Sequence, residues 1–140
     1  MRFRKHSTGP YRRWLTDTMS TTPAVSPRVL AALALAQGMD AAICVQPIPY
    51  VAKCLDDVHY PPRHRWVFPV IKAASALGLL GGTRSPGLAR LTLVLLTVYF
   101  ALAVGAHVRV RDFGLNAAAA STLLLTYGAL AARTIGAGRR

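Results

Sequence analysis

Charge is scarce in this sequence. Of its 140 residues, 16% are charged and only 5 are acidic, whereas 53% are hydrophobic. The apolar residues form long runs without Lys, Arg, Asp or Glu, including 91–108 and 113–132. A soluble domain built around one core does not need such runs, but a membrane-spanning helix does. The sequence therefore excludes an ordinary soluble domain, in agreement with its mean hydropathy of +0.35.

Motifs for catalysis are also absent. The sequence contains no glycine-rich phosphate loop, no nucleophile elbow and no haem-attachment motif. Cysteine, aspartate and histidine occur together in segment 54–64, but their spacing is not that of a zinc site. We therefore predict no catalytic residue and no metal, and no cofactor follows with certainty from the residues themselves.

Four apolar segments predict four membrane-spanning helices. The third and fourth are the clearest, because each contains an uncharged run about long enough to cross the hydrocarbon. The second is the weakest, since it is short and contains Pro69 and Lys72. The predicted spans are 28–46, 66–81, 86–108 and 113–133.

The segments between the spans contain signals for helix ends. Segment 50–65 is polar and is expected to be a loop. Ser85 is expected to cap the third span, with Pro86 at its first position, and Asp112 to cap the fourth. The other connections are short, which favours antiparallel neighbours. Because no segment alternates with the period of a strand, we predict an all-α fold, an integral membrane four-helix up-down bundle over residues 28–133.

The basic residues predict the orientation of this bundle. Residues 1–27 form a basic tail that we expect to be disordered, with Met1 or Met19 as its start, and 134–140 form a second basic tail. Eleven Lys and Arg residues lie on the side of the two termini, and five lie on the other side. The positive-inside rule then places both termini in the cytoplasm.

The net charge of +12 predicts a negatively charged partner. Basic residues beside membrane spans are attracted to the anionic lipids of the inner leaflet. We therefore predict a lipid bilayer with anionic lipids as the partner of these residues, and no nucleic acid.

Two ionisable residues lie inside the predicted spans. An unpaired charge within the bilayer costs roughly 3 kcal/mol or more, so Asp40 in the first span and Lys72 in the second are expected to face each other. At about 1.5 Å of rise per residue, both lie roughly 8 to 15 Å below the outer edge of the hydrocarbon. Two readings stay open: an ion pair that fixes helix packing, or part of a functional site.

Other polar residues belong to the same outer half of the predicted bundle. Together with Asp40 and Lys72 they predict a polar-lined pocket that opens outward, and they are Gln37, Cys44, Gln46, Tyr99, His107, Arg109 and Asn116. Cys44 and Cys54 lie at or beyond the outer edge, where an oxidising compartment permits a disulfide. Two such cysteines can also remain thiols.

Three segments resemble the DoxX-like family. They are the stretch from Gly38 to Tyr50, the run from Lys72 to Gly81, and the end of the third span from Tyr99 to Asp112, with its Ala-His-x-Arg-x-x-Asp pattern. The resemblance covers about Pro27 to Ala132. It implies a four-helix protein of the bacterial plasma membrane, a link to redox chemistry with quinone as the cofactor, and a redox-enzyme partner protein.

Three functions remain compatible with the sequence. The first is a non-catalytic membrane scaffold or assembly partner, in which Asp40 and Lys72 specify packing. The second is a quinone-linked accessory subunit of a redox or stress-protection complex. The third is a small transporter or proton path, for which four short helices leave little room.

Overall fold

The computed structural model describes residues 24–46 and 48–138, and the regular secondary structure in them is entirely helical. The helices are α2 (Pro27–Val45), α3 (Pro49–Asp57), a 3-10 helix (Pro62–His64), α4 (Val67–Gly82), α5 (Pro86–Arg109) and α6 (Leu115–Ala137). The all-α prediction is confirmed for this part of the chain. Most of the predicted basic tail, Pro47 and the last two residues lie outside the described residues.

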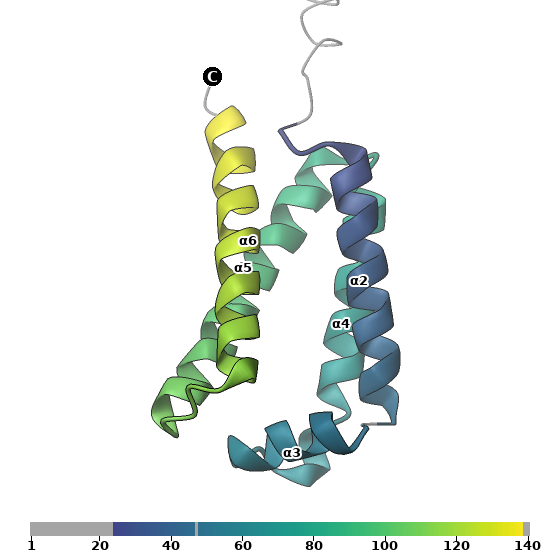
Figure 1. The fold of residues 1–140 in the computed structure, drawn as a ribbon. Coiled ribbons are helices and arrows are strands. Elements are labelled where there is room, and N and C mark those ends of the chain that lie inside the picture. The colour runs from purple at the N-terminus through teal and green to yellow at the C-terminus, as the bar shows by residue number, and fades with distance from the viewer. Residues whose placement is uncertain (1–23, 47, 139–140) are drawn as a thin grey trace, which may run out of the picture.

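The four long helices alternate in direction (Figure 1). Helix α2 packs against α4, α5 packs against α6, and α4 also contacts α5. We call α2 with α4 the first helix pair and α5 with α6 the second. Helix α3 lies across one end of the two pairs, and both ends of the described chain lie at the opposite end (Figure 1).

The prediction of four helices did not include α3. The segment 50–65, expected to be a loop, contains this nine-residue helix and the short 3-10 helix. Proline occupies the first turn of α3, where its missing amide hydrogen costs nothing. The described residues therefore contain five α-helices, not four.

The long helices have the length and surface expected of membrane spans. Helices α2, α5 and α6 are long and apolar enough to cross a membrane, whereas α4, with 16 residues, is shorter. Large apolar side chains point away from the protein on the long helices, among them Leu77 (71% exposed) and Leu125 (74% exposed). Such surfaces fit lipid better than water.

One helix end lies where the sequence predicts it, and two do not. Ser85 caps α5 by accepting a hydrogen bond from the Leu88 amide at 3.4 Å, with Pro86 at the first position, as predicted. Asp112 does not cap the fourth long helix, because its side chain is taken by His107 and the Gly114 amide. That helix begins at Leu115 and continues to Ala137, beyond the end expected at 133.

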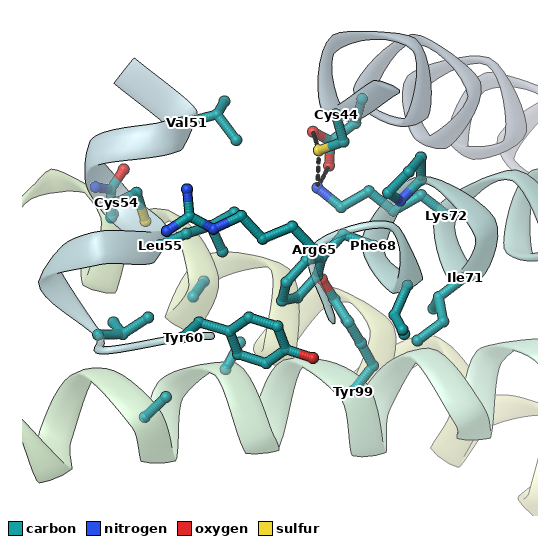
Figure 2. Close-up of a pocket in the computed structure, with 18 of the residues that line it drawn as sticks. Cys44, Val51, Cys54, Leu55, Tyr60, Arg65, Phe68, Ile71, Lys72 and Tyr99 are labelled. Carbon is teal, nitrogen blue, oxygen red and sulfur yellow. Dashed lines mark hydrogen bonds and ion pairs between the residues drawn. The ribbon is translucent and has the colours of Figure 1, made fainter. Parts of the chain in front are cut away.

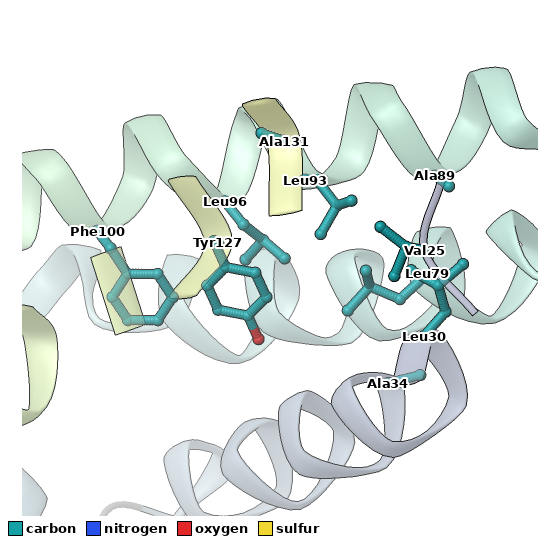
Figure 3. Packing of buried hydrophobic residues seen from close by; sticks show 10 residues of the cluster. All are labelled: Val25, Leu30, Ala34, Leu79, Ala89, Leu93, Leu96, Phe100, Tyr127 and Ala131. Atoms are coloured by element: carbon teal, nitrogen blue, oxygen red, sulfur yellow. The ribbon is translucent and has the colours of Figure 1, made fainter. Parts of the chain in front are cut away.

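The apolar core lies toward the end opposite α3 (Figure 3). Leu79 of α4 and Leu93 of α5 are fully buried there, next to Leu30 of α2. Phe100 and Tyr127 stack with ring centroids 5.4 Å apart and extend this cluster toward the middle of the molecule. The core therefore joins the two helix pairs at one end and leaves the other end to different side chains.

Close approach of α4 to α5 depends on glycine. A Cβ atom on Gly82 would lie 2.8 Å from the Ala89 Cα atom, and one on Gly78 would lie 2.4 Å from the Thr92 Oγ1 atom. Small residues that allow backbones to approach are the usual means of helix packing in lipid. The contact between the two helix pairs is therefore set by these two glycines.

We predict opposite effects of one substitution at two glycines. Gly82→Ala forces the Ala89 backbone to move and should destabilise the protein by about 1–3 kcal/mol, the usual cost of overpacking. Gly105→Ala meets no atom within 4 Å and should be neutral or stabilising, because alanine favours helix. Unfolding in detergent micelles measures both. Equal effects of the two variants would contradict this packing.

Candidate functional site

A cavity of about 1020 Å³ lies at the α3 end of the molecule. All five helices contribute to its wall, and most of the lining side chains are apolar. Ligand sites in proteins are commonly apolar cavities of this size with a few polar groups placed in them. The polar groups that line this cavity are therefore the candidate functional groups of the molecule (Figure 2).

Helix α3 forms one wall of the cavity through a single face. Val51, Cys54, Leu55 and Val58 line the cavity, and their spacing places them on the same side of a helix. On the remaining surface, Lys53 forms an exposed ion pair with Asp57 at 2.7 Å. The apolar stripe is the signal in the sequence that could have identified α3 as an amphipathic helix.

Three local features fix α3 over the cavity. The Tyr50 hydroxyl donates a hydrogen bond to the Asn116 Oδ1 atom on α6 at 2.5 Å. The Arg65 guanidinium forms an ion pair with Asp56. At the end of the helix, His59 has a φ of 57° and the Tyr60 amide bonds back to the Leu55 carbonyl at 2.8 Å, which reverses the chain.

Asp40 and Lys72 form the ion pair that the sequence predicts. The Lys72 Nζ atom lies 2.5 Å from the Asp40 Oδ2 atom and 3.4 Å from the Cys44 Sγ atom. The Lys72 side chain is 13% exposed and that of Asp40 is 42% exposed, and both line the cavity. The pair therefore links α2 to α4 and also presents polar atoms to the cavity (Figure 2).

Arg65 contributes a hydrogen-bond donor that has no partner. Its Nη2 atom contacts Asp56, but its Nε atom is buried and makes no hydrogen bond with any described residue. Leaving a buried donor of this kind unpaired costs about 1–3 kcal/mol. Arg65 lines the cavity, as do Tyr60 and Phe68, whose rings lie 4.7 Å apart.

His107 and Asp112 form a second polar pair at the cavity. The His107 Nδ1 atom lies 2.7 Å from the Asp112 Oδ2 atom, and His107 is buried. Asp112 also accepts a hydrogen bond from the Gly114 amide at 3.1 Å. His107 lines the cavity from α5, opposite the residues of α2 and α4.

The structure brings most of the predicted pocket residues together. Asp40, Cys44, Lys72, Tyr99, His107 and Asn116 all line the cavity, whereas Gln46 and Arg109 are exposed and do not. The Gln37 Nε2 atom instead donates a hydrogen bond to the Tyr127 hydroxyl at 2.8 Å, between α2 and α6. Sequence reasoning missed Tyr50, Tyr60, Arg65 and Trp66 as cavity residues, since it assigned the first three to a loop and Trp66 to the start of the second span.

Both cysteines of the chain are free thiols that line the cavity. Burial raises the pKa of Cys54 above its ordinary value, with the Asp112 charge as the next cause, so the thiol stays protonated at neutral pH. Among the described residues, no three His, Cys, Asp or Glu side chains are placed to hold a metal ion.

Comparison with known protein families gives one result. The DoxX-like family matches residues 28–132, which includes all four long helices except the first residue of α2 and the last residues of α6. No curated protein and no solved structure matches the chain. The match confirms the family resemblance found in the sequence.

We predict that Asp40 and Lys72 are energetically coupled. Lys72→Met or Asp40→Asn alone should destabilise the protein by about 1.5–3 kcal/mol, the usual range for hydrogen bonds to charged groups. The double variant should lose less than the sum of the two, because neither group is then left unpaired. Unfolding of the natural protein, the two single variants and the double variant in detergent micelles measures this coupling energy.

The matched control is the exposed pair of Lys53 and Asp57, to which the same two substitutions apply. That pair should show little coupling, because solvent screens it. Strictly additive effects at Asp40 and Lys72 would show that their contact does not stabilise the fold.

Proposed function

The chain belongs to the DoxX-like family, and from that premise we propose that it is a non-catalytic scaffold of the bacterial plasma membrane that holds a quinone-type ring ligand for a redox-enzyme partner. The large apolar cavity, with the cationic groups of Lys72 and Arg65 in its wall, supports this most directly. Three of the helices that surround the cavity, α2, α5 and α6, already fit an integral membrane protein by length and composition.

The residues of the cavity fit the chemistry of a quinone. A quinone is an apolar ring whose carbonyl oxygens only accept hydrogen bonds, and the guanidinium group of Arg65, which lines the cavity, is a hydrogen-bond donor. The Lys72 ammonium group is a second donor at the cavity wall. Because Arg65 and Lys72 are each paired with a carboxylate, the cavity suits a neutral ligand better than an anion.

The proposed roles of the chain are to bind, orient and shield the ligand. A bound quinone would supply electron and proton transfer to enzymes in the same membrane. Phe68 and Ile71 of α4 and Leu102 of α5 offer apolar surface to the ring. Helix α3 covers this end and limits the access of water.

The scaffold role and the ligand site use the same ion pair. Asp40 and Lys72 hold α2 against α4, which fixes two walls of the cavity relative to each other. Both residues also line the cavity, and the Asp40 side chain is 42% exposed, so a ligand in the cavity can reach the pair. This exposure favours a site over a purely structural contact.

We further propose that α4 crosses the membrane with the other three long helices, so that both termini are cytoplasmic. Arg28, Arg84, Arg90 and Arg133 belong to the helix ends and the turn away from α3, and no described acidic residue accompanies them. The positive-inside rule supports a cytoplasmic position for that end. Anionic lipids or the acidic surface of a partner enzyme would match its charge.

We predict that Cys54 reacts with a membrane-impermeant maleimide added to intact cells. A Cys44→Ser variant leaves Cys54 as the only thiol of the chain. Because its pKa is raised, the reactive thiolate is scarce at neutral pH, and labelling should accelerate as pH rises toward that pKa. Labelling only after permeabilisation would place α3 on the cytoplasmic side and overturn the orientation.

We predict that a short-tailed quinone quenches the fluorescence of a Trp14→Phe variant, in which the remaining tryptophan, Trp66, lines the cavity. Ala103→Phe fills part of the cavity and should weaken binding at least about tenfold, as loss of roughly 1.4 kcal/mol would. Ala101→Phe is the matched control, because Ala101 is exposed on the same helix and does not line the cavity. Absence of saturable quenching, or equal losses in both variants, would contradict the ligand site.

A further inference from the structure

The turn after α5 places Asp112 against His107. The Asp112 amide bonds to the His107 carbonyl at 3.0 Å, and the Arg111 amide bonds to the Val108 carbonyl at 3.1 Å. Arg111 has a φ of 56°, the left-handed conformation that this type of helix end requires. The reversal brings the carboxylate of Asp112 back over the last turn of α5, where it meets the imidazole ring.

The charge of Asp112 determines how His107 can hydrogen bond. The Gly114 amide first, and His107 second, hold the pKa of Asp112 below its ordinary value, so its carboxylate is ionised at neutral pH. An ionised carboxylate only accepts hydrogen bonds, so the His107 Nδ1 atom must donate to it. In the neutral ring the proton is then on Nδ1, and Nε2 is an acceptor.

The Nε2 atom has no partner in the part of the chain that the structure describes. The described hydrogen bonds of the His107 side chain include only the one from Nδ1 to Asp112. The residue is 6% exposed and lines the cavity, so the cavity is the place from which a ligand or a water can reach its ring. Because the His107 Nε2 atom accepts a hydrogen bond, it favours a ligand group that donates one.

We propose that the cavity prefers a ring ligand that carries a free hydroxyl group, such as a hydroquinone or a phenol, and that His107 Nε2 accepts the hydrogen bond from this hydroxyl. Asp112 is the positioning residue, because it acts through His107. This inference rests on the proposed function. It adds that the hydroxyl-bearing form of the ring ligand is preferred. A quinone has no hydroxyl, so it can use Arg65 but not His107.

The cavity is thus lined by the guanidinium group of Arg65, which donates hydrogen bonds, and by the oriented acceptor of His107. Arg65 precedes α4, and His107 belongs to α5. A ring with an acceptor at one position and a hydroxyl at another satisfies both, whereas an aliphatic chain satisfies neither. This complementarity makes a ring hydroxyl a better occupant than a lipid tail.

A matched pair of probes tests the proposal. The probes are 2-methyl-1-naphthol and its methyl ether, which share one ring system and differ in the hydroxyl hydrogen. Calorimetry of the full-length protein in detergent should show the naphthol binding roughly five- to tenfold more tightly, as expected for one hydrogen bond. His107→Leu should reduce this ratio to about one, and Asp112→Asn should reduce it partly, since the tautomer is no longer fixed.

The control variant is Asp57→Asn, which changes an aspartate outside the cavity and should leave the ratio as in the natural protein. Thermal unfolding of each variant shows whether it is folded. If His107→Leu does not fold, Asp112→Asn still tests the role of His107. Equal affinity for the two probes in the natural protein would overturn the role of His107, while saturable binding of the ether would leave the ligand site standing. Binding of neither probe would remove the ligand site itself.

Discussion

Lipid offers no hydrogen-bond partner, and the rest of this structure depends on that constraint. Polar side chains within the long helices are therefore most stable when they find a partner inside the protein. The hydroxyl groups of Thr92, Thr97 and Ser121 bond to the carbonyl four residues earlier in their own helix. Larger polar groups cannot do this, so they pair between elements, as Asp40 does with Lys72. The pairing of these groups concentrates polarity at the α3 end and leaves the opposite end to apolar packing.

This separation explains why the cavity lies where it does. At the end away from α3, Gly82 and the buried leucines allow α4 and α5 to approach closely. At the α3 end, long paired side chains such as Lys72 and Arg65 hold the helices around an open volume. Helix α3 then covers that volume with its apolar face. The cavity and the packed core are thus consequences of one distribution of polar residues along four helices.

The features predicted from the sequence are those that follow from local patterns. The apolar runs predict the long helices, and the cost of an isolated charge in lipid predicts that Asp40 meets Lys72. Helix α3 was missed because nine residues between prolines read as a loop. The pairing of His107 with Asp112 was missed because it depends on a left-handed conformation at Arg111, which arginine rarely adopts. Gln46 was placed in the pocket by depth alone, and depth does not say which side of a helix a residue faces.

The central claim is that the cavity at the α3 end holds a neutral ring ligand. It is tested most directly by extracting the protein, purified from its own membranes in mild detergent, and measuring the ring compounds released per chain by mass spectrometry. The account predicts a stoichiometric amount of a quinone or hydroquinone from the natural protein and a much smaller amount from a variant whose cavity is filled. The same trace amount from both proteins, at the level of the detergent blank, would contradict it.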